Sequence, residues 1–370
     1  MSFESAMSFV LPLAALDPEE IADLRATVRS AATESGYPTA VLELEKSETG
    51  LDPTLWSLLA QDIGLSAVGL PESAGGLGGL AEILAVAEEL GATLAPVPFI
   101  TSTVLCGQVL AASDESAAPY LERIAGGEIA APAVTNARGL WSAADISCTS
   151  DGEKVSGTVR FAPFGVSATF FVVAARTDSG IDVFVVEASD AHINGLPSMD
   201  FSRPSATVTF DGAPAVRLTT GGNGESVITQ AVDVALMAVA ADQLGGSQAC
   251  FDMTLDYIKV RRQFNREIGS FQAIKHRMAD ALMLVEMLRS GLEKVTSGGM
   301  QDLAADAATN KSWGSDSYIA MTAEAIQLHG GIGFTWEHTA HLYFRRARYD
   351  AAFLGDGSFQ RERLATLLNW

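Results

Sequence analysis

The fold of this chain is inferred from one stretch, YIKVRRQFNREIGSFQAIKHRMAD, residues 257–280. A long apolar segment, Ala231–Leu255, precedes it with apolar residues at helical spacing, and that spacing resumes over Ala281–Leu292. The stretch is therefore predicted to be a short polar connection between two buried helices. Six of the 24 Lys and Arg residues of the chain lie in it: Lys259, Arg261, Arg262, Arg266, Lys275 and Arg277.

This group of cations has two interpretations. In the first, it is a solvated face with ion pairs to Asp252, Asp256 and Glu267, which contribute little at a surface. In the second, it binds an anion, because helix ends and guanidinium groups commonly hold phosphates. A further group of cations at 345–348 leaves the same two possibilities open.

Length, charge and cysteine content limit the classes of protein to which the chain can belong. A chain of 370 residues is long enough for about two or three domains. Its 24 basic and 45 acidic side chains give a net charge of −21, which argues against a nucleic-acid partner. No apolar run of membrane-spanning length stands out and MSFESAMSFV lacks leader features, so a cytoplasmic protein is expected. Cys106, Cys148 and Cys250 are predicted to be core thiols.

The first third of the chain predicts helices. Asp17-Pro18 and Asp52-Pro53 each place a capping side chain before a proline at the first helical position. The glycine-rich stretch 68–79 is predicted to be a turn leading into a helix over Leu80–Leu90. It is not read as a phosphate-binding loop, because no Lys-Ser/Thr pair follows it.

After about Gly127 the pattern changes to short β-branched or alternating runs separated by turn residues. The runs are Ile129–Thr135, Ile146–Thr149, Lys154–Val159, Thr169–Ala175, Ile181–Val186 and Ala206–Phe210. Strands at this spacing predict a small antiparallel barrel or sandwich. Helical spacing returns near Glu225, so the predicted fold is α+β and mostly α. Its domains are predicted at 1–127, 128–220 and 221–370.

Three motifs of the chain resemble those of the acyl-CoA dehydrogenase family. Arg261-x-x-Phe264, Phe271-Gln272, His276 and Ala279-Asp280 resemble the family's Arg-x-x-Phe-Gly…Phe-Gln…His…Ala-Asp signature. LPESAGGLGG and AVAEELGATLAPVPF, within residues 70–99, resemble a segment of its N-terminal domain. Gln327-x-x-Gly330-Gly331-x-Gly333 resembles its Gln-x-x-Gly-Gly-x-Gly motif. The resemblance covers nearly the whole chain and implies an N-terminal helical domain, a middle β-barrel or sandwich and a C-terminal four-helix bundle.

The resemblance also implies a flavin cofactor, FAD, and residues that hold it. In the family these motifs contact the adenine and pyrophosphate end of an FAD whose ring belongs to the neighbouring subunit. The corresponding residues here are Arg261, Phe264, Gln272, Gln327, Gly330 and Gly331. The chemistry suits the role, because a guanidinium pairs with a diphosphate and an aromatic face stacks on adenine. Asn265 replaces the usual glycine, and asparagine tolerates the left-handed backbone region.

The catalytic base of the family has no clear counterpart. Many members carry it as the glutamate of a Glu-Gly-Thr loop, where this chain reads Phe353-Leu-Gly-Asp-Gly-Ser358. One alignment puts Asp356 at the glutamate position and a gap-free one puts Leu354 there. Members that place the base in the long helix would align it with Ala235, two residues from Asp233. A misplacement of about 1 Å costs on the order of 100-fold in rate, so Asp356 is a weak candidate base.

The stretches that surround the flavin ring in the family also differ here. The segment VTNARGLW, 134–141, replaces a Thr-Glu-Pro-Gly-x-Gly-Ser stretch. Phe161 stands at the family's tryptophan position, and Pro163 at a position whose hydroxyl donates to the ring. Proline offers no donor. The residues that would serve a neighbouring subunit's flavin are thus kept, whereas those that would serve the chain's own flavin are not.

This division resembles the paired, heterotetrameric acyl-CoA dehydrogenases that actinobacteria use on steroid-derived CoA thioesters. It implies a partner subunit that is homologous and catalytic, an acyl-CoA substrate and an electron-transfer flavoprotein as acceptor. The apolar residues of Ala231–Leu255 and Leu303–Leu328 occupy more than one stripe, which also predicts subunit contact. Two alternatives stay open: a self-sufficient dehydrogenase that uses Asp356, and an acyl-CoA-binding scaffold without redox chemistry.

Overall fold

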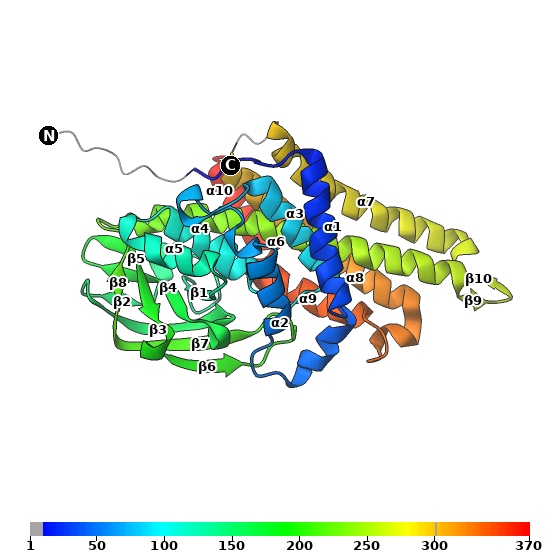
Figure 1. The fold of residues 1–370 in the computed structure, drawn as a ribbon. Helices are drawn as coiled ribbons and strands as arrows, with labels where there is room; N and C mark the ends of the chain where they lie inside the picture. Colours follow the sequence, from blue (N-terminus) through cyan, green and yellow to red (C-terminus); the bar gives the residue numbers. More distant parts are fainter. Residues whose placement is uncertain (1–9, 300–301) are drawn as a thin grey trace. The chain divides into compact units, whose positions relative to one another are not determined.

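A computed structural model describes residues 10–299 and 302–370 (Figure 1). The N-terminal stretch for which no leader is expected lies almost wholly outside them. The described residues form two compact units, which are considered separately. The first comprises the chain up to Leu24, Leu44–Ile83 and Pro96–Ala235, and the second comprises Arg25–Glu43, Leu84–Ala95 and Leu236–Trp370. The division at 1–127, 128–220 and 221–370 stays a prediction.

Ten α-helices are labelled in the described residues: α1 Pro18–Glu34, α2 Pro53–Ser57, α3 Leu80–Thr93, α4 Gly107–Ala111, α5 Ala118–Ala125, α6 Gly224–Val260, α7 Gln272–Lys294, α8 Leu303–His329, α9 Ala340–Ala352 and α10 Gly357–Leu367. The predicted start signals are confirmed. Asp17 accepts from the N–H groups of Glu19 and Glu20 at 2.9 and 3.0 Å, and Asp52 accepts from Thr54 at 3.0 Å. Helix α3 begins at Leu80, as the glycine-rich turn before it predicts.

The first unit contains the sheet. Its strands are β1 Ala130–Ala133, β2 Thr149–Ser150, β3 Lys154–Pro163, β4 Phe170–Thr177, β5 Gly180–Glu187, β6 His192–Leu196, β7 Ser205–Pro214 and β8 Val216–Arg217. They form one eight-stranded sheet in the order β6-β7-β3-β2-β4-β5-β8, with β1 added to β4. The predicted antiparallel pairing is wrong for two pairs, because β1 and β2 each lie parallel to β4, whereas β2 pairs antiparallel with β3. Strands β6 and β8 are missed by the sequence pattern, because their side chains are mostly exposed and lack apolar alternation.

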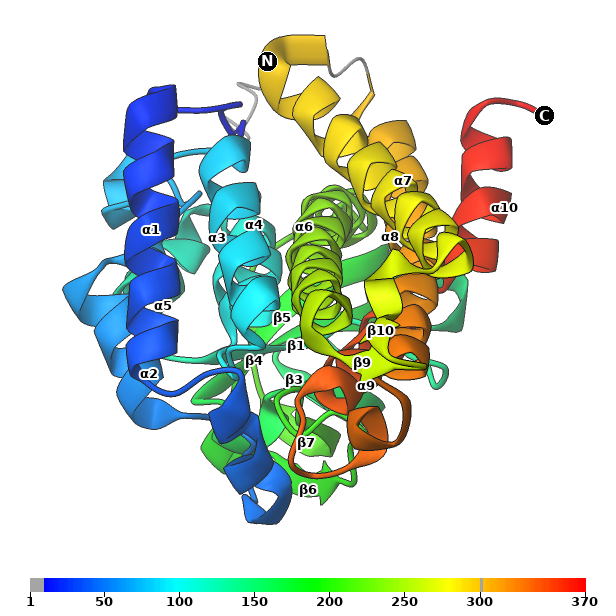
Figure 2. The same ribbon diagram turned by 90° about the vertical axis from the view of Figure 1, so that its right-hand side faces the viewer.

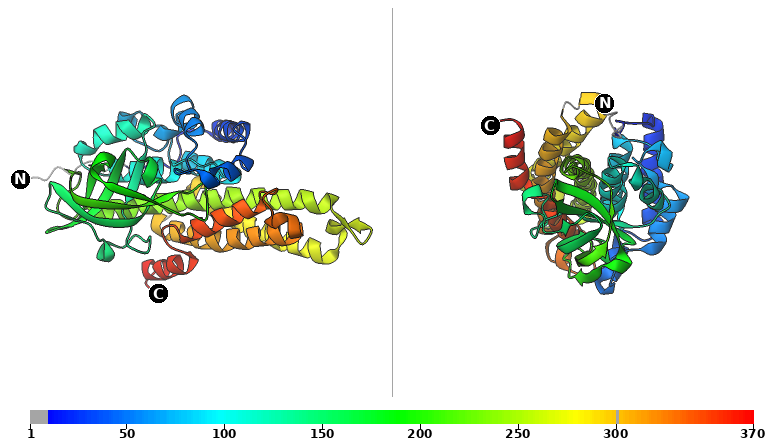
Figure 3. Two further views of the ribbon diagram at one scale, coloured as in Figure 1. Left: turned by 90° about the horizontal axis from the view of Figure 1, so that it is seen from below. Right: turned by 90° about the vertical axis from the view of Figure 1, so that its left-hand side faces the viewer.

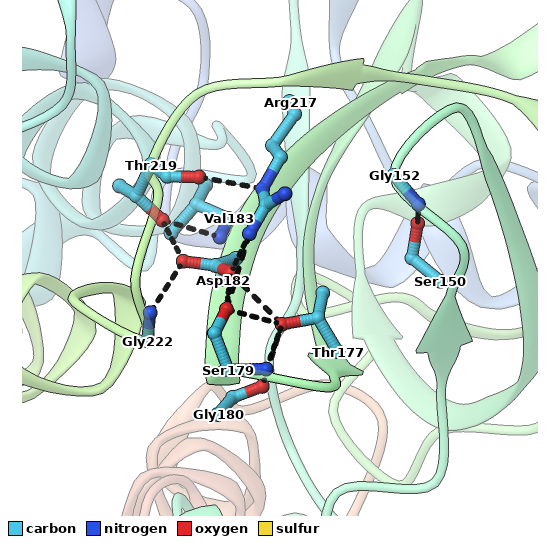
Figure 4. A network of polar contacts seen from close by, with 10 residues as sticks. All are labelled: Ser150, Gly152, Thr177, Ser179, Gly180, Asp182, Val183, Arg217, Thr219 and Gly222. Carbon is cyan, nitrogen blue, oxygen red and sulfur yellow. Dashed lines mark hydrogen bonds and ion pairs between the residues drawn. The ribbon is translucent and has the colours of Figure 1, made fainter.

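A buried carboxylate ties the end of this sheet together (Figure 4). Asp182 of β5 is fully buried and forms an ion pair with Arg217 of β8. It also accepts from the Thr177 hydroxyl at 3.0 Å, the Thr219 hydroxyl at 3.1 Å and the Gly222 N–H at 3.2 Å. Asp182 therefore anchors β8 and the segment that leads into α6.

The anchor can be tested by removing it. Asp182→Ala leaves Arg217 and the buried donors without their shared acceptor, so we expect a loss of about 3 kcal/mol in the free energy of unfolding. Asp211→Ala, at an exposed position of β7, is the control and should stay within about 0.5 kcal/mol of wild type. Urea unfolding measures both. A loss for Asp182→Ala no larger than that of the control would contradict the anchoring role.

The second unit is a helical bundle in which α8 packs against α7, α9 and α10, as expected from the helical spacing (Figure 2). Its core holds an ion pair between Asp242 of α6 and Arg346 of α9, whose atoms lie 3.1 Å apart with both side chains fully buried. For Arg346, neither sequence interpretation of the cations at 345–348 is therefore right. It is a core residue.

Helix α6 is long and apolar. By length and composition alone it could cross a membrane, contrary to the expectation that no apolar run has that length, but 83% of its most apolar window is buried inside the protein. That is the pattern of a core helix. Most of α8 is buried as well. The chain itself thus covers the apolar stripes from which subunit contact was predicted, and they no longer argue for a partner.

Candidate functional site

The central stretch of the sequence folds into a helix end, a tight hairpin and a helix start. Helix α6 ends at Val260, and β9 (Arg262–Gln263) pairs with β10 (Arg266–Glu267) so that Gln263 lies opposite Arg266. Phe264 and Asn265 form the loop between them, with φ of +51° and +62°. Positive φ at both positions is what a type I′ hairpin turn requires. The left-handed backbone expected of Asn265 is confirmed, whereas that of Phe264 was not foreseen and costs about 1 kcal/mol or more.

The hairpin displays an aromatic side chain to solvent. Figure 3 shows the hairpin projecting beyond the ends of α6 and α7. Phe264 is 87% exposed, and its ring meets Phe271 edge to face with centroids 6.3 Å apart. The guanidinium carbon of Arg266 lies 3.7 Å from the centroid of the Phe271 ring, a cation–π contact that steadies the base of the loop. Beside the hairpin, Gln272 opens α7 and its amide nitrogen lies 3.0 Å from Nε2 of His276.

The second part of the predicted FAD contact is the end of α8. Gly330 caps this helix with φ +65°, and its N–H donates to the carbonyls of Gln327 and Ile326. Gly330 and Gly331 are exposed, and a side chain added at either would meet no atom within 4 Å. The turn is therefore a helix cap and also leaves main chain open to a ligand.

Contacts between distant residues bring the two parts to one end of the second unit. The ring of Tyr257, one turn before Arg261, stacks on His329 with centroids 4.4 Å apart. Its hydroxyl donates to the His329 carbonyl at 3.3 Å. The set Arg261, Phe264, Gln272, Gln327, Gly330 and Gly331, called here the nucleotide half-site, is exposed throughout. A guanidinium, an aromatic face, two amides and open main chain fit the adenine and diphosphate of FAD. Their contact with FAD stays a prediction.

The C-terminal loop, Phe353–Asp356, is buried at Leu354 and Gly355 and exposed at Asp356. Leu354 has φ +57° and a buried side chain, so the position of the gap-free alignment holds an apolar core residue. Asp356 is the N-cap of α10, where its carboxylate accepts from the Phe359 N–H at 2.8 Å. The ammonium group of Lys311 in α8 donates hydrogen bonds to the Gly355 carbonyl at 2.8 Å and to the Ala351 carbonyl at 3.3 Å. These bonds hold the loop against α8. Burial lowers the pKa of Lys311 to about 8.

The stretches aligned with the flavin-ring pocket lie together in the first unit. The hydroxyl of Thr135 donates to the carbonyl of Phe161 at 3.4 Å, and Phe161 and Pro163 fall in the last residues of β3. Asn136 is buried, and its side-chain carbonyl accepts from the N–H groups of Arg138 and Leu140 at 2.9 and 3.1 Å. The side-chain oxygen of Asn136 therefore stabilises the turn that follows it in the same stretch.

The predicted site residues did not include Tyr257 and His329. Both lie inside the quoted stretches of sequence, but their spacing along the chain gives no sign that rings 72 residues apart stack. Only the folded bundle shows that contact.

Comparison with known proteins places the chain in a family. Residues 18–128 match the acyl-CoA dehydrogenase N-terminal domain and residues 222–368 match the C-terminal domain. The chain is 34% identical to the acyl-CoA dehydrogenase IpdE2 of Mycolicibacterium smegmatis, over 94% of this chain and 98% of that protein. It is 31% identical to the acyl-CoA dehydrogenase FadE27 of Mycobacterium tuberculosis, over 87% and 90%.

Solved structures agree with these matches. The ChsE4-ChsE5 complex from Mycobacterium tuberculosis has a TM-score of 0.85 and 29% identity, over 96% of this chain and 98% of that chain. A variant of the Tcur3481-Tcur3483 steroid acyl-CoA dehydrogenase has a TM-score of 0.85 and 27% identity, over 95% and 98%. The predicted helical, β and helical architecture is that of these proteins, and the chain belongs to the acyl-CoA dehydrogenase family.

Proposed function

We propose that this chain is one subunit of a heteromeric, flavin-dependent acyl-CoA dehydrogenase. The complex would introduce an α,β double bond into a CoA thioester. This chain would supply the nucleotide half-site, and a homologous partner subunit would supply the catalytic base and the flavin-ring pocket. The observation that carries the proposal is the C-terminal loop, whose carboxylate caps a helix while Leu354 is buried.

The chemistry explains why that loop matters. The reaction needs a carboxylate that removes the α-proton of the thioester, within hydrogen-bond reach of that proton. FAD, when bound, accepts the hydride from the β-carbon. In this chain the Asp356 carboxylate is oriented by a backbone N–H at the start of α10, and Ala235 is a fully buried apolar residue. The Asp356 position thus carries an exposed carboxylate that is engaged as a helix cap, and the Ala235 position carries no carboxylate.

The nucleotide half-site has a role that needs no base. Arg261 would pair its planar guanidinium with the diphosphate, and Phe264 would stack on the adenine. Gln272 and Gln327 would add hydrogen bonds, and the main chain at Gly330 and Gly331 is open enough for close approach. Because these groups face solvent, they would gain most of their binding energy when a partner subunit encloses them.

Exposed apolar side chains at the same end of the second unit support contact with a partner. They are Val260, Phe264, Ile332, Phe334 and Trp336, with Phe264 at 87% and Phe334 at 75% exposure. A cluster of exposed apolar side chains on a protein surface indicates a binding face. This cluster, and not the buried stripes of α6 and α8, supports contact with a partner subunit.

The relatives support the finer parts of the proposal. One similar structure is a complex of two chains, ChsE4 and ChsE5, and another is named as a steroid acyl-CoA dehydrogenase. A heterotetramer that acts on a steroid-derived CoA thioester is therefore the assembly and substrate class that we propose. An electron-transfer flavoprotein as electron acceptor and a cytoplasmic location complete the proposal.

The half-site is tested by removing its cation. Arg261→Ala deletes a charge-assisted contact to the diphosphate, so the complex should bind FAD more weakly by about 1.5–3 kcal/mol, or roughly 10- to 100-fold. Flavin fluorescence of the complex with a dehydrogenase homologue encoded beside this chain measures the affinity. Lys154→Ala, which removes an exposed cation at the start of β3, is the control and should bind FAD as wild type does. Equal affinity for Arg261→Ala and the control would speak for the scaffold alternative.

The missing base is tested by a substitution that keeps the helix cap. Asparagine caps a helix about as well as aspartate, so Asp356→Asn removes the carboxylate without loosening α10. We expect the complex to turn over within about threefold of wild type, because the base belongs to the partner. The self-sufficient alternative demands a loss of several powers of ten in kcat with flavin still bound. That result would overturn the proposed division between the subunits.

A further inference from the structure

Two residues outside the nucleotide half-site join its two parts. The carbonyl of Tyr257 accepts from the Arg261 N–H at 2.9 Å, so Tyr257 holds the residue that opens the hairpin. Its ring and its hydroxyl contact His329, the last residue of α8. His329 lies two residues after Gln327 and directly before Gly330. The Tyr257–His329 stack therefore adjoins both parts of the half-site, the hairpin through Tyr257 and the end of α8 through His329.

The hydrogen bonds of His329 fix its protonation. The residue is only 4% exposed, and Nδ1 of its ring lies 2.7 Å from the Ala325 carbonyl oxygen. A carbonyl can only accept, so Nδ1 carries the proton and Nε2 presents a lone pair in the neutral ring. Within the part of the chain that the structure describes, Nε2 has no hydrogen-bond partner. A second proton on this ring would therefore create a buried cation without an acceptor for its N–H.

Two rings contact the His329 ring. The Tyr257 ring of α6 stacks on it, and the centroid of the His338 ring lies 4.4 Å from its own. Beyond His338 lies His341 of α9, whose own pKa is lowered by burial and by the cation of Arg345. The groups that contact the His329 ring thus include an aromatic ring and an imidazole.

We propose that the Tyr257–His329 stack is a positioning device, which sets the separation of the hairpin from the Gln327–Gly331 turn and holds only while the His329 ring is neutral. The inference rests on the proposed function, because it assigns a role at the same half-site. Tyr257 and His329 are positioning residues. They place Arg261 and the α8 turn without contacting the cofactor themselves.

The acid response follows from the sign of the pKa shift. Burial lowers the pKa of His329 below its ordinary value of 6.5, so the folded chain binds that proton more weakly than the unfolded chain does. The stability contributed by the neutral stack is complete above the unfolded pKa and is lost as the pH falls through the folded one. Below the folded pKa, the competent fraction falls about tenfold for each pH unit, and the apparent affinity for FAD falls with it.

The test compares FAD affinity of the complex from about pH 8 to pH 5, a range that spans the ordinary pKa of histidine. Wild type should show a weakening limb in acid. His329→Phe keeps a stacking ring that cannot titrate, so it should bind FAD near wild type at neutral pH and lose the acid limb. His329→Ala removes the ring and should bind weakly at every pH. His192→Phe, at an exposed position of β6, is the control and should keep the wild-type profile.

A second measurement separates this inference from the proposed function. Urea unfolding of the chain alone, over the same pH range, needs no flavin. Wild type should lose stability below about pH 6.5 more steeply than His329→Phe does. If Arg261→Ala leaves FAD affinity unchanged, the proposed function fails, and the unfolding profiles still decide the neutral-ring requirement. An acid limb in His329→Phe as steep as in wild type, in affinity or in stability, overturns the positioning device.

Discussion

The second unit depends on one buried ion pair, Asp242 with Arg346. Both side chains are fully removed from solvent, and taking two charges out of water costs several kcal/mol each unless they are paired. A shift of α9 along α6 would separate the two buried charges, so the pair opposes such a shift. Helix α9 in turn adjoins two regions of functional interest, one at each of its ends. His338, which precedes its first residues, packs against His329, and its last residues lead into the C-terminal loop.

These two places differ in a way that defines the subunit's proposed role. In the C-terminal loop, Leu354 is buried, Lys311 donates to the Gly355 carbonyl, and the exposed Asp356 caps a helix. The nucleotide half-site is open, with every member exposed. Exposed polar groups bind weakly in water, where screening and side-chain entropy offset their attraction. An open half-site without a base of its own therefore fits a chain that completes a partner's cofactor site.

Local chemistry decided which features could be predicted. Helix starts at Asp17 and Asp52 were predictable because a cap and a proline act over a few residues. Strand β6 was not, because an exposed strand lacks the alternation of a half-buried one. The half-site residues came from motifs, but the Tyr257–His329 stack joins residues 72 apart and needed the fold. The capping role of Asp356 was readable from Asp-Gly-Ser before a helix, yet the family motif drew attention to catalysis instead.

The flavin content of this chain, purified alone and together with a dehydrogenase homologue encoded beside it, tests the central claim most directly. The account predicts that the chain alone carries almost no flavin and that the complex carries FAD, seen in its absorption spectrum. Each bound FAD would be shared between one copy of this chain and one copy of the partner. A chain that purifies alone with stoichiometric FAD and oxidises an acyl-CoA would contradict it.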